Sequence, residues 1–130
     1  MNKDLSSKIE TILSRDSSFH FDAYEFVLKA LNYTQDKMDR DGHVTGQELS
    51  EGIKKYALEQ YGPMAKTVLT HLGVNSTGDL GRIVYNMIDA GLMKKNEQDS
   101  QDDFKDVYDF NQAFNVFKLR NNTAGSNNGQ

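Results

Sequence analysis

The chain of 130 residues contains no cysteine, no tryptophan and no long apolar run. Without cysteine, disulfide frameworks, zinc sites with cysteine ligands, thiol catalysis and redox switching are excluded. No segment approaches the roughly 20 apolar residues that span a bilayer. Residues 1–16 carry scattered charges and lack the apolar stretch of a signal peptide. We therefore expect a soluble, cytoplasmic protein that does not enter a membrane.

The net charge is −4 and the pI is about 5.3. An acidic balance disfavours non-specific binding to nucleic acid or to an anionic membrane, because phosphate groups repel it. The length fits one domain that can bury a core without disulfides. We predict a single compact domain over residues 1–119 and a disordered tail over residues 120–130, which are rich in asparagine and glycine.

Apolar residues recur at helical spacing along most of the chain. Thr45 and Glu48 have the spacing of a capping box at the start of a helix. Gly62 followed by Pro63 suits the end of one helix and the start of the next. The expected helices cover residues 4–15, 22–34, 45–61, 63–72, 77–90 and 112–119, with polar residues 35–42 as a loop.

Two short segments near the end of the domain favour strands. Residues 92–95 are short and partly apolar, and residues 104–110 alternate apolar and polar side chains with a high aromatic content. Pairing them would make a hairpin. The order helix, helix, turn, helix and hairpin is typical of a winged-helix module. The predicted fold is therefore mainly α with a small β-hairpin, in which two N-terminal helices precede a winged-helix-like centre.

Residues 37–48 resemble an EF-hand loop. With Gly42 at the sixth position, Asp39 is third, Asp41 is fifth and Glu48 is twelfth. Lys37 stands at the first position, where calcium needs an oxygen ligand. The capping box also gives Glu48 a structural role. A degenerate EF-hand-like calcium binder is therefore the second alternative function, and no metal ligand is assigned.

A winged helix would place residues 77–90 in the major groove of DNA. The candidate DNA-binding residues are Arg82 and Asn86 on that helix, with Lys94 and Lys95 after it. The following segment opposes a polyanion with Glu97, Asp99, Asp102, Asp103, Asp106 and Asp109. Sequence-specific DNA binding is thus the first alternative, and the charge pattern disfavours nucleic acid.

No catalytic motif is present. His20, His43 and His71 do not form a helical metal-binding pair, since none has a second histidine three or four residues away. The sequence lacks GxSxG, P-loop and GxGxxG patterns. We therefore predict no enzymatic activity, no catalytic residue and no cofactor.

Six tyrosines in so small a domain favour a contact surface, because tyrosine suits interfaces that are dry on one side and wet on the other. We assign partner binding to Tyr61, Tyr85, Asp102 and Asp103. The predicted function is a non-enzymatic protein-interaction module whose acidic segment favours a basic partner. The sequence leaves the partner and the oligomeric state open.

Residues 43–49 (HVTGQEL), 78–93 (GDLGRIVYNMIDAGLM) and 103–110 (DFKDVYDF) together resemble a family of small uncharacterised proteins described mainly from planctomycetes and verrucomicrobia. The similarity covers about residues 21–114. It implies one compact domain, and it implies no activity, cofactor or catalytic residue. It also argues against calcium, because the shared pattern centres on VTGQEL and not on the acidic loop positions.

Overall fold

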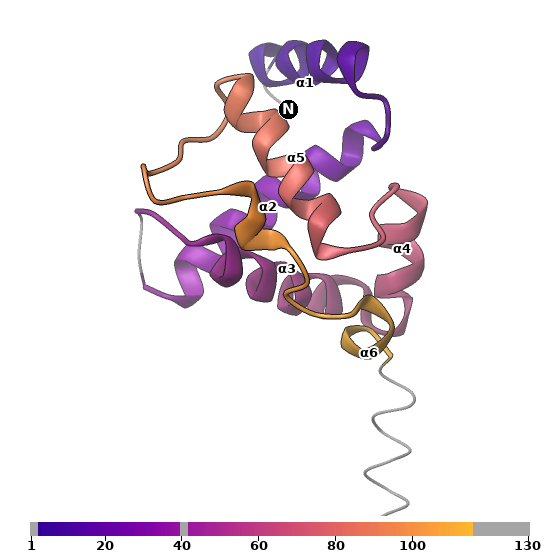
Figure 1. Ribbon diagram of the computed structural model, residues 1–130. Helices are drawn as coiled ribbons and strands as arrows, with labels where there is room; N and C mark the ends of the chain where they lie inside the picture. Colours follow the sequence, from indigo (N-terminus) through magenta and orange to yellow (C-terminus); the bar gives the residue numbers. More distant parts are fainter. Residues whose placement is uncertain (1–2, 40–41, 116–130) are drawn as a thin grey trace, which may run out of the picture.

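The computed structural model describes residues 3–39 and 42–115, and no residue in these ranges belongs to a β-strand. The chain folds into helices joined by short turns (Figure 1). In chain order they are α1 (Lys3–Arg15), α2 (Phe21–Lys37), α3 (Gly46–Tyr61), the 3-10 helix η1 (Gly62–Met64), α4 (Ala65–His71), α5 (Thr77–Asp89), the 3-10 helix η2 (Gln101–Phe104) and α6 (Phe110–Ala113).

Side-chain caps determine where the helices begin. The Thr45 hydroxyl accepts a hydrogen bond from the Glu48 amide at 3.1 Å, and the Glu48 carboxylate accepts one from the Thr45 amide at 2.9 Å. The predicted capping box of α3 is therefore confirmed. Ser76 caps α5 by accepting from the Asp79 amide at 3.2 Å. Gly62, with φ 52°, ends α3 in a conformation that glycine adopts without steric cost.

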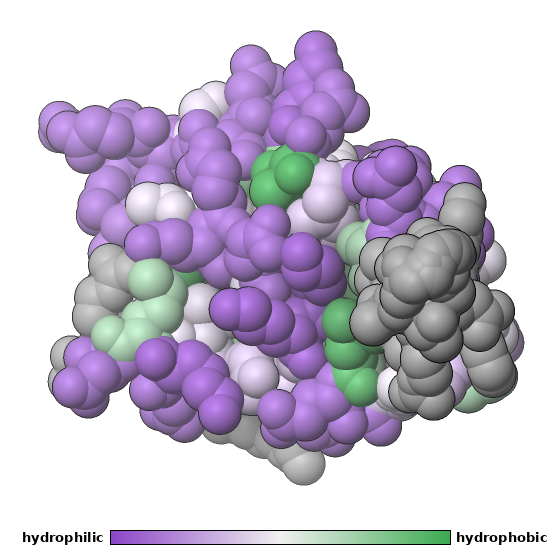
Figure 2. Space-filling view, turned by 90° about the horizontal axis from the view of Figure 1, so that it is seen from below, coloured by the Kyte–Doolittle hydropathy of each residue, from purple (hydrophilic) through white to green (hydrophobic). Residues whose placement is uncertain are grey.

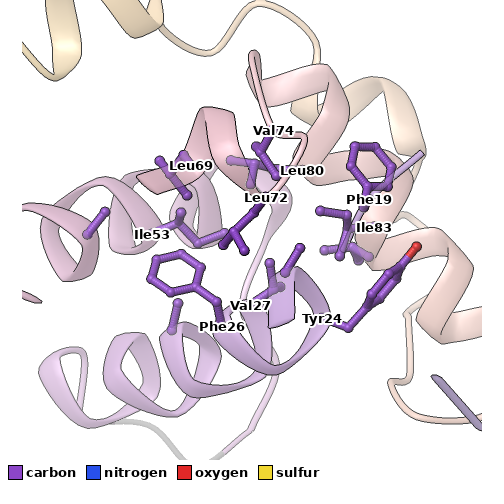
Figure 3. Packing of buried hydrophobic residues seen from close by; sticks show 14 of the residues in the cluster. Phe19, Tyr24, Phe26, Val27, Ile53, Leu69, Leu72, Val74, Leu80 and Ile83 are labelled. Carbon is purple, nitrogen blue, oxygen red and sulfur yellow. The ribbon is translucent and has the colours of Figure 1, made fainter. Parts of the chain in front are cut away.

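Helix α2 lies at the centre of the molecule. It packs along α3, crosses α5 and carries α1 on its first half, while α4 packs against α3 (Figure 1). The core fills the space between α2, α3, α4 and α5 (Figure 3), and α1 adds Ile9 and Ile12 to it. Its largest fully buried apolar side chains are Tyr24, Ile9, Ile12, Ile53, Leu69, Leu80, Ile83, Met87, Val27 and Val74. Burial of each such side chain contributes about 1.5–3 kcal/mol.

Few large apolar side chains of the described residues are exposed. The face seen from below is mostly hydrophilic, with only small and separate hydrophobic areas (Figure 2). Among the described residues, Met64 is the one large apolar side chain that is mostly exposed, at 55%. None of the described helices is long and apolar enough to cross a bilayer.

The predicted β-hairpin and winged-helix centre are wrong. Residues 92–95 form bends and irregular backbone, and residues 101–104 form η2. Ser100 caps η2 through a second capping box, and Asp109 caps α6. The alternation of aromatic residues has another cause: Phe104 is buried against α3 and α5, and the later aromatic rings, Tyr108, Phe110 and Phe114, pack on one another.

Some predicted bounds also move. Helix α2 continues through residues 35–37, because polar side chains on its exposed face do not interrupt a helix. The last helix begins at Phe110, two residues before the predicted start, because Asp109 accepts a hydrogen bond from the Gln112 amide at 3.1 Å. Residues 116–119 of that predicted helix and the predicted tail, 120–130, lie outside the described residues.

Candidate ligand pocket between α2 and α5

A pocket of about 460 Å³ opens between the second half of α2, the start of α3, the end of α5 and the segment 91–104, and we name it the α2–α5 pocket. Its apolar lining consists of Leu31, Val44, Leu49, Val84, Ile88, Leu92, Met93 and Phe104. Its polar lining consists of Gln35, His43, Tyr85, Lys94, Lys95, Asn96, Asp99, Ser100 and Asp103. An apolar pocket of this size with a few polar groups is typical of a binding site.

Three glycines let the chain enclose the pocket. Gly91, with φ 79°, lets the chain turn away from the end of α5. Residues 91–104 form the outer wall of the pocket, and this wall meets α3 and α5 again at Phe104. A Cβ atom on Gly46 would lie 2.8 Å from the Asp103 Cβ, and one on Gly81 would lie 2.7 Å from the Phe104 Cβ. The absence of side chains at these positions therefore allows η2 to pack directly on α3 and α5.

The Tyr85 hydroxyl is the unusual polar group of the pocket. The oxygen is buried and has no hydrogen-bond partner among the residues that the structure describes. Burial raises the pKa of Tyr85 above its ordinary value, and the charges of Asp99 and Asp103 raise it further. The hydroxyl therefore stays protonated and can donate a hydrogen bond. A buried group of this kind costs free energy unless a partner satisfies it.

The acidic groups of the pocket wall do have partners. One Asp99 oxygen lies 3.1 Å from His43 Nε2, and the other accepts from the Asn96 amide at 2.7 Å. Asp103 accepts from the Ser100 amide at 3.0 Å. These contacts brace the outer wall and join it to the loop before α3.

The structure brings several predicted site residues together. Tyr85 and Asp103, which were assigned to partner binding, both line the α2–α5 pocket, as do Lys94 and Lys95 from the DNA-binding alternative. Asp102 is exposed and lies on η2, the 3-10 helix that also contains Asp103. The side chain of Lys95 donates to the carbonyl oxygens of Asn96 and Asp99, at 3.1 and 3.5 Å.

Tyr61 lies away from these residues, at the end of α3. Its ring is half-buried and stacks on Phe26, with ring centroids 5.9 Å apart. Tyr61 thus extends an aromatic row on α2 and α3 that also contains Tyr33 and Tyr56. The structure therefore gives Tyr61 a packing role away from the pocket.

Arg82 and Asn86 face a different part of the molecule. Both donate to the Asp16 carboxylate, and Asn86 also donates to the Tyr24 hydroxyl at 3.1 Å. The pKa of Asp16 is held well below its ordinary value, first by the hydrogen bond from Asn86 and then by those from Ser18 and Arg82. These residues therefore attach the end of α1 to α5.

The EF-hand-like loop is only partly described, because Asp41 lies outside the described residues. In the described part, one Glu48 oxygen accepts from the Thr45 amide, and the Lys37 ammonium lies 5.4 Å from the centre of the Tyr33 ring. Residues 3–39 and 42–115 hold no group of three histidine, aspartate or glutamate side chains placed to bind a metal.

Sequence reasoning missed the pocket itself and the role of His43. The His43–Asp99 pair joins residues that are 56 positions apart, and no local sequence pattern indicates this contact. His20 and His71 likewise meet only in the folded chain, where their exposed rings stack with centroids 5.3 Å apart.

Comparison of the chain with protein-family models, curated proteins and solved structures gives no match. The family resemblance noted from the sequence therefore stays a prediction.

Proposed function

We propose that this chain is a non-enzymatic interaction module that binds a protein partner by receiving one apolar side chain of the partner in the α2–α5 pocket. The observation that carries the proposal is the Tyr85 hydroxyl, which is buried beside an apolar lining without a partner among the described residues. A ligand that fills the pocket and accepts from this hydroxyl would offset the cost of burying it.

The size and rim of the pocket support a protein partner. A volume of about 460 Å³ lies toward the lower end of the range for ligand pockets, roughly 300–1,000 Å³, and suits an anchoring side chain. The exposed residues Lys94 and Lys95 line the pocket, and the exposed Asp102 is the chain neighbour of the lining residue Asp103. A partner surface could pair with both signs of charge around its anchor.

The charge of the outer wall and of the residues that directly follow it supports a basic partner. Residues 92–109 contain six carboxylates (Glu97, Asp99, Asp102, Asp103, Asp106 and Asp109) and three lysines (Lys94, Lys95 and Lys105), a net charge of −3. Four of the carboxylates, Glu97, Asp102, Asp106 and Asp109, belong to exposed residues. We therefore expect the partner to carry basic residues beside its apolar anchor.

Selection of displayed peptides tests the proposal. Peptides are selected on the wild-type chain, and their affinities are then measured for Met93→Trp, which fills the pocket from its rim, and for Met64→Trp, which changes an exposed methionine outside the pocket. We expect the peptides to share an apolar residue, to bind Met64→Trp as they bind wild type, and to lose about tenfold or more in affinity for Met93→Trp.

Equal affinity for wild type and Met93→Trp would overturn the proposal. Pocket binding by small molecules but not by any peptide would overturn the choice of a protein partner. The basic character of the partner has its own test, since raising the salt from about 0.05 to 0.3 M should weaken binding by screening the charges. Affinity that does not change with salt would contradict a basic partner.

A further inference from the structure

The hydrogen bonds already formed by the pocket wall restrict which chemical groups a ligand can present to it. The carboxylates of Asp99 and Asp103 already accept backbone amide hydrogen bonds, and Asp99 also pairs with His43. The Tyr85 hydroxyl differs from them, because it is a buried donor without an acceptor among the described residues. The group that completes the pocket must therefore present an acceptor atom.

The surrounding charges favour an acceptor without charge. The negative charges of Asp99 and Asp103 both raise the pKa of the Tyr85 hydroxyl, and for the same reason they disfavour a second anion beside it. The Lys95 ammonium is directed to the carbonyl oxygens of Asn96 and Asp99. A carboxylate beside this hydroxyl would therefore lose its hydration and meet the negative charges of Asp99 and Asp103, which the exposed ammonium group of Lys94 opposes, whereas an amide carbonyl needs no such compensation.

We propose, on the basis of the proposed function, that the partner places an uncharged amide carbonyl against the Tyr85 hydroxyl, next to the apolar side chain that fills the α2–α5 pocket, and that the pocket rejects a carboxylate at this position. An apolar residue inside a peptide has a backbone carbonyl beside its side chain. A free C-terminal residue or a fatty acid presents a carboxylate instead, so the pocket selects internal peptide segments.

Two probes of the same shape test this inference. 4-Methylpentanamide and 4-methylpentanoate share an apolar body and differ in the charge of the head group. We titrate each into the full chain and follow the resonances of the pocket residues by NMR. The amide should bind at millimolar concentration, and the carboxylate should bind at least about tenfold more weakly.

Variants identify the hydrogen bond. Tyr85→Phe should lower the affinity for the amide by about 5- to 10-fold, the usual value of one neutral hydrogen bond. Tyr61→Phe is the matched control, because this tyrosine lies outside the pocket, and it should leave the affinity unchanged. Equal binding of the two probes, unchanged affinity of the amide for Tyr85→Phe, or no binding of the amide up to about 10 mM would overturn the inference.

The peptides selected in the preceding experiment separate the two proposals. If they require the open pocket but bind Tyr85→Phe as tightly as wild type, the interaction function stands and the carbonyl inference fails. If their binding is insensitive to Met93→Trp, the pocket function fails whatever the small probes do.

Discussion

The guanidinium of Arg82 forms two hydrogen bonds, each 2.9 Å long, with the carboxylate of Asp16, a residue 66 positions earlier in the chain. The same guanidinium donates to the Ser18 hydroxyl at 2.8 Å and lies 5.4 Å from the centre of the Phe19 ring. This two-bond geometry is the strong form of an arginine–carboxylate contact. It attaches the turn after α1 to the outer face of α5.

The Asp16 contact should make stability depend on pH. The folded-state pKa of Asp16 is depressed, so its contribution is full above the ordinary aspartate pKa of about 3.9 and is lost as the pH falls below it. We expect Asp16→Asn to lower the free energy of unfolding by about 1–3 kcal/mol at pH 7 and to flatten its fall below about pH 4. Urea unfolding at several pH values measures both effects.

Glu10→Gln is the control for Asp16, because Glu10 is an exposed carboxylate on α1, the helix that precedes Asp16. It should keep the wild-type pH dependence. A slope for Asp16→Asn that equals the wild-type slope in acid would contradict the assignment.

Two tyrosine hydroxyls should have opposite effects on stability. Tyr85→Phe removes a buried hydroxyl that has no partner among the described residues, and we expect it to raise the free energy of unfolding by about 1 kcal/mol. Tyr108→Phe removes a donor that lies 2.6 Å from the Ser50 carbonyl, and it should lower that free energy by about 1 kcal/mol. Denaturant unfolding of the two variants provides the comparison, and destabilisation by Tyr85→Phe would refute the unpaired state of its hydroxyl.

The seam between α2 and α3 should not tolerate a side chain at Gly52. A Cβ atom there would lie 2.8 Å from the Thr34 Cβ, and Thr34 is buried with its hydroxyl donating to the Ala30 carbonyl. We expect Gly52→Ala to lower the free energy of unfolding by about 1–3 kcal/mol through overpacking. Thermal or urea unfolding measures the change.

Two further variants check the cause of the Gly52 effect. Gly78→Ala, in a helix where the nearest atom is the Ser76 oxygen at 3.5 Å, should stabilise by about 0.5–1 kcal/mol through lower backbone entropy in the unfolded chain. Thr34→Ala added to Gly52→Ala should recover part of the lost stability. Failure of this rescue would mean that Thr34 is not the obstacle.

The outer wall of the pocket should depend on Phe104, which is 3% exposed. We expect Phe104→Ala to lower the free energy of unfolding by about 3–5 kcal/mol and to abolish binding of 4-methylpentanamide. Lys105→Ala changes the exposed neighbour and should do neither. Retained probe binding in a folded Phe104→Ala variant would show that the wall is held by other contacts.

Helix positions were predictable because their signals are local. The Thr45 cap is satisfied by Glu48, three residues away, and Gly62 ends α3 through its own φ angle. The same local reasoning failed for residues 92–110. Alternating aromatic residues are compatible with a strand, but the caps at Ser100 and Asp109 start helical turns, and Phe104 is buried by two distant helices.

The candidate site was predictable only in part. Tyr85 and Asp103 were chosen for residue type, and the folded chain places both in the lining of one pocket. Arg82 was chosen for its charge, but its partner, Asp16, comes from a helix far away in sequence. The residue type determines the chemistry of a side chain, whereas its hydrogen-bonding partner depends on which segments pack together.

The sequence by itself determined the helical character and most helix boundaries, since each follows from a residue and its neighbours within one or two helical turns. It also determined the acidic balance, which depends on composition alone. Tertiary packing alone decided that residues 91–104 enclose a pocket, that His43 meets Asp99, and that the Tyr85 hydroxyl is buried without an acceptor among the described residues. These features join positions tens of residues apart, and their geometry arises only when α2, α3 and α5 share one core.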